Sequence, residues 1–522
     1  MTFNDLLNTL LMIAYLISSF GLFLYGINYY AMILMQRRAR ERMLKHDEAV
    51  WMAWAVTDRE LPQVTIQLPT YNERYVIQRL IEAVVRLDYP KDRLEIQLLD
   101  DSTDETTAIA AQLTEQYRQE GFDITLRHRR QRTGYKAGAL KQGLEVAKGE
   151  FIAIFDADFT PPPDFLRRTL PFFVDPAIAV VQTRWGYINQ DYSLLTRSQT
   201  YAIDGHFWVE QTARCWSGFF LHFNGTAGIW RRKAIDDAGG WQADTLTEDI
   251  DLSYRAQLRG WRIKFLPQVV CPAELPVQMC AIKAQHYRWA MGSFQTAKKL
   301  IPRVLKAEVP LLTKYQAVLH LGTYMLFPFI LVLTLTAPPL PLFEKFHSTR
   351  DHFLGIAIVV SISSFGPFCC YLYAQTQLYD NWKRRLVYFP SLLVLVTGIT
   401  LNSTMAILEA VLNVHKPFAR TPKFRIERSS DTWVDKRYRV PFPWLSLFEA
   451  LIAVYYAYGI FLLIQRGKYL IGPLFILTTM GFTSVALLSL WEFLQSSVGR
   501  PEPAQNQLGS ARPTISADPK RQ

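Results

Sequence analysis

Long apolar segments occur towards both ends of this chain and enclose a central region that is patterned like a water-soluble domain. Residues 5–35 are almost free of charge and lead into the basic run Gln36-Arg37-Arg38-Ala39-Arg40. A helix needs about 20 apolar residues to cross a bilayer, so this segment is long enough. Its basic residues follow the apolar run, whereas a signal peptide carries them before it. We therefore predict an uncleaved anchor over residues 1–40, with the following domain in the cytosol.

Apolar segments return after residue 300. Five stretches have this character, over residues 316–344, 353–375, 386–411, 445–464 and 469–495. The loop from His415 to Arg439 is rich in Lys and Arg, which places it on the cytosolic side. Five crossings would put that loop outside, so one segment should not cross. We select residues 386–411, because their polar second half contains Glu409 and favours an amphipathic helix along the interface.

The composition agrees with a soluble domain joined to membrane segments. Of 522 residues, 50% are hydrophobic, while 20% are charged. The net charge of +11 includes no basic run interleaved with aromatic residues, so no nucleic-acid partner is expected. The five cysteines form no CxxC pair, which argues against a disulfide framework or a structural zinc site. The tail over residues 499–522 is rich in Pro, Ala, Gln and Ser and is predicted to be disordered.

The region from Leu61 to about Leu300 alternates β-rich runs with helical stretches such as Val76 to Leu87 and Thr106 to Glu120. The runs are VTIQLPT, LEIQLLD, DITLRHR, FIAIFDAD and AVVQTRW. Strands separated by helices of about 10–15 residues predict a mostly parallel, doubly wound α/β sheet. Ligands bind such sheets at the carboxyl ends of the strands. Polar residues that follow these runs are therefore candidate site residues.

Two acidic motifs come directly after predicted strands. Asp156-Ala157-Asp158 follows FIAIF, and its carboxylates suit Mg²⁺ or Mn²⁺, which take further ligands from a diphosphate. Taken alone, the motif also fits solvated loop carboxylates. Asp100-Asp101 follows EIQLL and precedes Ser102-Thr103-Asp104. One interpretation is a helix N-cap and the other is a carboxylate that accepts a hydrogen bond from a nucleobase; both can hold at once.

Two further motifs stand near predicted helix starts. The stretch from Gly134 to Leu140 resembles a loop entering a helix, a place that favours phosphate, and Lys136 adds a positive charge. Thr247-Glu248-Asp249 comes after the Gly-rich turn from Phe223 to Gly228. A carboxylate at this position can accept the proton of an attacking hydroxyl. The alternative is a helix-start carboxylate near the helix dipole.

Gln285-His286-Tyr287-Arg288-Trp289 is the most distinctive motif. An indole offers a flat face to a sugar ring, and the guanidinium of Arg288 can bind diphosphate charge that develops in a transition state. The alternative is an amphipathic helix with Arg and Trp at the membrane surface, because an apolar segment follows.

In their order along the chain, these motifs resemble the D, DxD, TED, QxxRW set of inverting, membrane-embedded glycosyltransferases of family 2. Cellulose, chitin and hyaluronan synthases belong to that family. The stretches QLLDDSTDETT, RTGYKAGALKQGL and HFNGTAGIWRRKAIDDAGGW are similar to cellulose synthase-like A and C proteins, which make mannan, glucomannan or glucan backbones. The resemblance covers residues 60–300. It implies a GT-A-type fold, Rossmann-like and mostly parallel, beside α-helical transmembrane segments over residues 301–498, with a cytosolic loop at about 412–443.

The resemblance also implies a role for each motif residue. Asp249 is expected to be the catalytic base, with Glu248 beside it. The residues expected to bind the donor are Asp100, Asp101, Lys136, Asp156 and Asp158. Of these, Asp156 and Asp158 are also expected to hold a divalent cation, Mg²⁺ or Mn²⁺. The residues expected at the acceptor and diphosphate site are Gln285, Arg288, Trp289, Phe223, Gly225 and Thr226.

In such enzymes the acceptor hydroxyl attacks the anomeric carbon directly and yields a β-glycoside. The resemblance implies transfer of a hexose from UDP-glucose or GDP-mannose to a growing β-linked polysaccharide. The alternative acceptor is a membrane lipid such as ceramide or diacylglycerol, because lipid-modifying relatives carry a similar Arg-Trp motif. The stretch Phe418–Lys423, FARTPK, keeps the spacing of the FxVTxK gating loop of cellulose synthases. Since no long plant-type insertion is recognised, we expect a multi-pass protein of a bacterial membrane.

Overall fold

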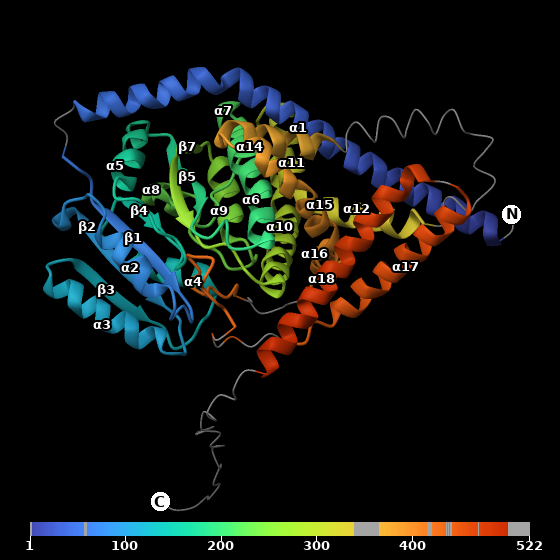
Figure 1. The fold of residues 1–522 in the computed structure, drawn as a ribbon. Coiled ribbons are helices and arrows are strands. Elements are labelled where there is room, and N and C mark those ends of the chain that lie inside the picture. The colour runs from blue at the N-terminus through green and yellow to red at the C-terminus, as the bar shows by residue number, and fades with distance from the viewer. Residues whose placement is uncertain are drawn as a thin grey trace, which may run out of the picture.

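The computed structural model describes residues 3–56, 60–338, 365–414, 420–434, 436, 438, 441–467 and 469–498. The predicted disordered tail, most of the predicted segment 353–375 and Phe418 lie outside the described residues. Figure 1 shows an α/β domain at one side of the molecule and a group of long helices at the other. The long helix α1 passes along both parts.

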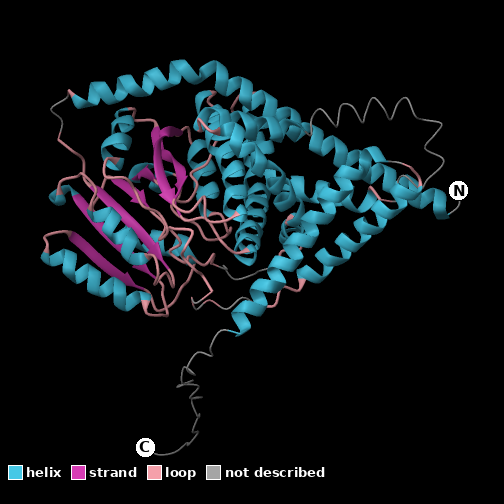
Figure 2. Cartoon of the chain, viewed as in Figure 1, coloured by secondary structure: helices cyan, strands magenta, loops and turns pink. Residues whose placement is uncertain are grey.

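One seven-stranded sheet forms the centre of the α/β domain, in the order β3-β2-β1-β4-β6-β5-β7 (Figure 2). Its strands are β1 (Val64–Thr70), β2 (Leu94–Asp100), β3 (Asp123–His128), β4 (Phe151–Ile154), β5 (Ile178–Tyr187), β6 (Gly228–Arg231) and β7 (Arg262–Ala273). Only β6 runs antiparallel to its neighbours. The pairs β1–β2, β1–β4, β2–β3 and β5–β7 are parallel. The fold class predicted from the alternation of strands and helices is confirmed.

Both faces of the sheet are covered, because side chains alternate between the faces along each strand. In β4, Phe151 and Ala153 join a core with α2 and α3, whereas Ile152 and Ile154 join one with α4, α8 and α9. The helices of this part are α2 (Ile77–Val85), α3 (Thr106–Gln119), α4 (Tyr135–Glu145), α5 (Phe165–Thr169), α6 (Leu194–Gly205), α7 (Thr212–Trp216), α8 (Arg232–Asp237), α9 (Glu248–Gln257) and α10 (Met279–Lys306). Shorter helical turns are η1 (Lys91–Arg93), η2 (Leu170–Val174) and the π-helical η3 (His206–Gln211).

The five β-rich runs of the sequence all form strands, and the helices expected near residues 76–87 and 106–120 are α2 and α3. Strands β6 and β7 were not predicted. The four residues of β6 leave little room for a pattern, and Pro267 and Pro272 interrupt the apolar run of β7. Because β7 lies at the edge of the sheet, it tolerates prolines that a central strand would exclude.

Helix α1 (Phe3–Ala55) continues well beyond the predicted anchor and its basic run. Its second half lies on the α/β domain (Figure 1), where Trp51 Nε1 donates to the carbonyl oxygen of Arg168 at 2.8 Å. Asp47, which is fully buried, forms an ion pair with Lys264 of β7. The anchor and the sheet are therefore joined by one rigid helix.

Helices after α10 form the other part of the molecule. They are α11 (Leu311–Leu321), η4 (Thr323–Met325), α12 (Leu326–Thr336), α14 (Trp382–Arg385), η7 (Leu386–Tyr388), α15 (Phe389–Gly398), α16 (Thr400–Val411), α17 (Leu445–Gln465), η8 (Tyr469–Ile471) and α18 (Gly472–Val498). Within the described residues, four helical stretches are long and apolar enough to cross a membrane. A fifth is counted if the pair Leu311–Leu321 and Thr323–Thr336, bent by 58°, is one span.

The segment predicted to lie along the interface, 386–411, forms η7, α15 and α16. The helical stretch Trp382–Val411 is long and apolar enough to cross a membrane, and 56% of its most apolar part is buried inside the protein. The placement of this segment along the interface stays a prediction.

We predict that Asp47→Ala destabilises the protein by about 3–5 kcal/mol, because it leaves the Lys264 ammonium buried without its partner. The matched control is Glu41→Ala on the same helix, which removes a solvent-exposed pair with Lys45 and should leave the unfolding temperature unchanged. Thermal unfolding of the detergent-purified chain, followed by tryptophan fluorescence, measures both. Equal unfolding temperatures for the two variants would contradict a stabilising role of the buried Asp47–Lys264 pair.

Candidate active site

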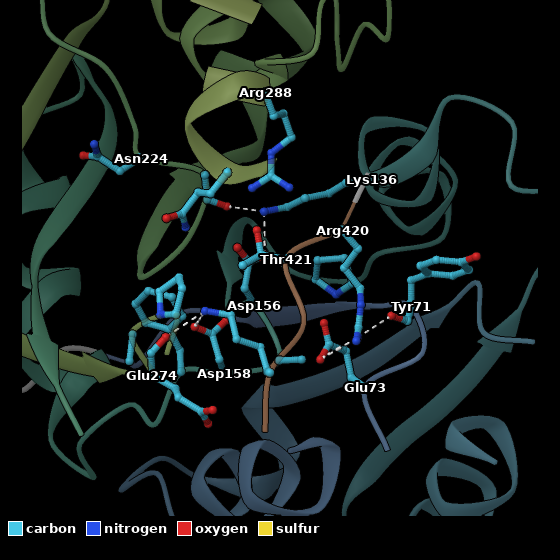
Figure 3. Close-up of a pocket in the computed structure, with 18 of the residues that line it drawn as sticks. Tyr71, Glu73, Lys136, Asp156, Asp158, Asn224, Glu274, Arg288, Arg420 and Thr421 are labelled. Atoms are coloured by element: carbon cyan, nitrogen blue, oxygen red, sulfur yellow. Dashed lines mark hydrogen bonds and ion pairs between the residues drawn. The ribbon is translucent and has the colours of Figure 1, made fainter. Parts of the chain in front are cut away.

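A pocket of about 200 Å³ opens at the carboxyl ends of β1 and β4 and is closed on its other sides by α9, α10 and residues 420–423 (Figure 3). The predicted site residues that line it are Asp101, Lys136, Asp156, Asp158, Gly225, Glu248, Asp249, Gln285, Arg288 and Trp289. Side chains that are far apart in the sequence thus meet in one place. Three predicted residues, Asp100, Phe223 and Thr226, do not line the pocket.

The carboxylates of the Asp-x-Asp motif are each paired with a lysine. Lys136 Nζ lies 2.5 Å from Asp156 Oδ1 and also donates to the carbonyl oxygen of Gly225 at 2.9 Å. Lys423 Nζ lies 2.7 Å from Asp158 Oδ2. Burial alone lowers the pKa of the Lys136 ammonium, but nearby carboxylates, Asp156 first, outweigh it and hold that pKa above its usual value. Lys136 is therefore charged at neutral pH.

The donor set at Asp156 and Asp158 is that of a partial cation site. Mg²⁺ and Mn²⁺ sites of this type use one or two carboxylates and take their remaining ligands from phosphates and water. No group of three or more His, Cys, Asp or Glu side chains that could hold a metal by itself occurs among the described residues. Two carboxylates that line one pocket fit a divalent cation that takes its remaining ligands from phosphate and water.

Asp101 and Asp100 have different environments despite being adjacent. The guanidinium of Arg129 donates two hydrogen bonds of 2.6 Å to the carboxylate of Asp101, which lines the pocket. Asp100 is fully buried, and its oxygens accept hydrogen bonds from the backbone of Ser102 at 3.0 Å and from Thr107 Oγ1 at 2.6 Å. The structure thus places Asp100 as a support for the turn after β2, with Asp101 left to face a ligand.

Glu248 and Asp249 form the first turn of α9 inside the pocket. Asp249 Oδ1 accepts a hydrogen bond from the backbone N–H of Ile250 at 2.9 Å. Burial, and then the negative charge of Glu248, raise the pKa of Asp249 to about 7. Burial also raises the pKa of Glu248, which lies 4.0 Å from Lys136. A carboxyl group with a pKa near neutrality is suited to accept a proton at physiological pH.

Gly225 allows the acceptor-facing turn to approach these groups closely. Its φ of +79° favours glycine, and a Cβ at this position would meet Asp249 Oδ2 at 3.0 Å and Lys136 Nζ at 3.5 Å. The neighbours predicted with it act from behind the pocket. Phe223 is fully buried against Trp230, and Thr226 Oγ1 accepts a hydrogen bond from the backbone N–H of Asp156 at 2.8 Å. They hold the turn and the Asp-x-Asp motif in register.

Helix α10 brings Gln285, Arg288 and Trp289 to the same pocket. In Figure 3 the guanidinium of Arg288 points toward Lys136. Burial lowers the pKa of Arg288, while Glu248 and Asp156 act in the opposite direction. Arg288 therefore adds a second positive charge beside Lys136, which itself pairs with Asp156.

Several pocket residues had no assigned role in the sequence. Glu73 follows β1 as Asp101 follows β2, and it pairs with Arg420 at 2.8 Å. Burial raises the pKa of Glu73 to about 7. Glu274, after β7, accepts from the backbone N–H of Phe424 at 2.8 Å, and its carbonyl oxygen accepts from Lys423. No strand was predicted before Glu274, and only contact with residues 420–424 reveals the partners of both glutamates.

Residues 62–292 match the family described as Glycosyltransferase like family 2. The chain is 41% identical over 370 residues to glucomannan 4-beta-mannosyltransferase 1 of Oryza sativa subsp. japonica, covering 68% of this chain and 65% of that protein. It is 45% identical over 250 residues to glucomannan 4-beta-mannosyltransferase 2 of Arabidopsis thaliana, covering 47% of each. Residues 62–292 are a domain of glycosyltransferase family 2, and the chain is similar to the cellulose synthase-like members of that family. This confirms the predicted family, its GT-A-type fold and the glycosyltransferase class of the domain.

Two features of these relatives bear on the predictions. The matches span 45% to 65% of the relatives' own length, and the relatives are plant proteins. They give the predicted bacterial origin no support.

A solved mannosyltransferase of Pyrobaculum calidifontis, in complex with GDP-Man and Mn²⁺, aligns over 74% of this chain and 99% of its own, with 20% identity and a TM-score of 0.44.

We predict that Gly225→Ala lowers the rate of transfer by this family 2 domain, because the added methyl group would lie 3.0 Å from Asp249 Oδ2 and would push that carboxylate out of place. A small misplacement of a reacting group costs about 10-fold or more in rate. Gly218→Ala is the matched control, since Gly218 has a φ of +70° but open space around its Cβ position. Both variants should lose about 1–2 kcal/mol of stability from the left-handed backbone. An equal loss of initial rate in the two variants would contradict the prediction.

Proposed function

We propose that the protein is a membrane-embedded inverting glycosyltransferase that transfers mannosyl units from a nucleotide sugar to a growing β-linked polysaccharide. The observation that carries this proposal is the gathering of Asp156, Asp158 and Asp249 with Lys136 and Arg288 in one pocket. Such a set serves the three needs of the reaction: a place for a metal-bound diphosphate, a base, and positive charge for the leaving group.

In the proposed reaction Asp249 accepts the proton of the acceptor hydroxyl. The hydroxyl oxygen forms its bond to the anomeric carbon as the bond from that carbon to the diphosphate breaks. One displacement inverts the carbon, so an α-linked donor gives a β-glycoside and needs no covalent enzyme intermediate. Lys136 and Arg288 stabilise the negative charge of the departing diphosphate. A divalent cation held by Asp156 and Asp158 neutralises part of the same charge when bound.

The names of the curated relatives support mannose as the transferred sugar, since both are 4-beta-mannosyltransferases. We therefore propose GDP-mannose as the donor and UDP-glucose as the alternative. Asp101 is held rigidly by Arg129, and Arg132 stacks 3.5 Å above the ring centre of Tyr71 at the same end of the pocket. This polar and aromatic end suits a nucleobase.

A polysaccharide acceptor is supported by the same names and by the position of α10, which lies between the α/β domain and the membrane helices (Figure 1). The indole of Trp289 lines the pocket on this side and gives a sugar ring a flat surface. A lipid acceptor remains the alternative. The two acceptors give products of different solubility, so the solubility of the labelled product distinguishes them.

The test incubates the purified full chain with Mn²⁺ or Mg²⁺ and a panel of radiolabelled nucleotide sugars. We expect incorporation from GDP-mannose into material that is insoluble in alkali and depends on the cation. Label that partitions into chloroform would overturn the polysaccharide acceptor, and incorporation from UDP-glucose alone would overturn mannose. No incorporation from any donor would overturn the transferase proposal.

We predict that transfer increases as pH rises through about 7, because Asp249 must be ionised to accept a proton and burial raises its pKa to that value. Asp249→Asn should reduce kcat by about 10²–10⁴-fold at every pH, with donor affinity preserved. Initial rates between pH 5.5 and 8.5, and titration of the variant with the nucleotide sugar, measure the two effects. A fully active Asp249→Asn variant would refute the assignment of the base.

A further inference from the structure

The last three membrane helices contain one acidic residue each: Glu409 in α16, Glu449 in α17 and Glu492 in α18. Glu449 is fully buried and Glu492 is 2% exposed. A carboxylate among apolar membrane helices is costly to bury, so it persists where a specific partner stabilises it. Each of the three glutamates has a partner on one helix, α10.

Glu492 caps the start of α10 from outside that helix. Its two carboxylate oxygens accept hydrogen bonds from the backbone N–H groups of Met279 and Cys280, the second at 2.8 Å. The first N–H groups of a helix have no partner within it, and a negative charge there is favourable. The side chain of the N-cap residue, Gln278, makes no such hydrogen bond. The N-terminus of α10 is thus fixed to α18.

The two other glutamates continue along the same face of α10. Lys283 Nζ lies 2.8 Å from a carboxylate oxygen of Glu449, and both side chains are buried. The hydroxyl of Tyr287 donates to Glu409. Residues 279, 283 and 287 are each four apart, about one helical turn, so they form one stripe along the helix.

The opposite side of α10 faces the active site. Gln285, Arg288 and Trp289 line the pocket, and one turn further Gly292 lies against Thr247, where a Cβ would come within 2.6 Å of Thr247 Cγ2. Thr247 immediately precedes Glu248 and Asp249. Because side chains on both faces belong to one rigid helix, a shift of its membrane-facing stripe moves Arg288 and presses on the turn that carries the base.

We propose that Glu409, Glu449 and Glu492 are positioning residues for the transfer step: they set the height and rotation of α10, and through it the acceptor side of the site. This inference rests on the proposed function. The base-binding end of the pocket is built differently, since Asp101 and Arg129 come from the ends of β2 and β3. The membrane helices therefore control the reacting groups at the acceptor side without controlling the end of the pocket proposed for the nucleobase.

The test compares Glu492→Ala, Glu492→Gln and Tyr287→Phe in the full chain reconstituted in lipid nanodiscs. We expect kcat to fall about 10-fold or more in Glu492→Ala and less in Glu492→Gln, whose amide oxygen still accepts one hydrogen bond, while the donor KM stays within about threefold of the wild type. Tyr287→Phe removes one hydroxyl and should lower kcat to a smaller extent. Glu308→Gln, an exposed change just beyond the end of α10, is the matched control and should leave both constants unchanged.

Hydrogen–deuterium exchange of the same samples gives a readout that does not need activity. Peptides of α10 and of the turn before α9 should exchange faster in the Glu492 variants, while peptides of β1 to β3 should not change. Unchanged exchange in α10, or an unchanged kcat in all three variants, would overturn the inference. A donor KM that rises in proportion to the loss of folded protein would also overturn the inference, because it would indicate that the variants only unfold the protein. An inactive wild type whose Glu492 variants show the expected exchange would contradict only the proposed function.

Discussion

The contact of Lys136 with Asp156 and with the carbonyl oxygen of Gly225 is the interaction on which the active site depends. Asp156, Glu248 and Asp249 are carboxylates from distant parts of the chain, and their mutual repulsion in a shared pocket opposes the fold that assembles them. The Lys136 ammonium offsets this repulsion together with Arg288, and it ties β4, the Gly225 turn and α9 together. In the proposed reaction the same ammonium also stabilises the departing diphosphate.

Helix α10 connects the pocket with the membrane helices. Its polar motif faces the carboxylates, and its other side is held by glutamates of three different membrane helices. Isolated membrane helices pack without a strong hydrophobic driving force, so hydrogen bonds between them define their relative positions well. The catalytic domain is consequently built onto the membrane helices rather than merely tethered to them, and α1 adds a second connection through Asp47 and Lys264.

Much of the fold was predictable because strands β1 to β5 are short apolar runs separated by helical stretches, and acidic motifs stand at the ends of β2 and β4. The same logic found Asp101, Asp156 and Asp158, since the carboxyl ends of parallel strands meet at one edge. Strands β6 and β7 escaped it, one being too short and the other interrupted by prolines. Asp100 shows the limit of motif reasoning: it neighbours Asp101 in the sequence, but the alternation of side chains turns it inward to its own turn.

The sequence by itself determined the chemistry available to this protein: an α/β domain with carboxylates at strand ends, a Gln-x-x-Arg-Trp helix, and apolar helices on both sides. These features are local, and spacing and periodicity encode them. Only the tertiary structure decided which charges pair, because Lys423 with Asp158, Arg420 with Glu73 and Glu492 with the start of α10 join residues more than 200 positions apart. No local pattern records such a pairing, because it follows from the packing that brings the buried groups together.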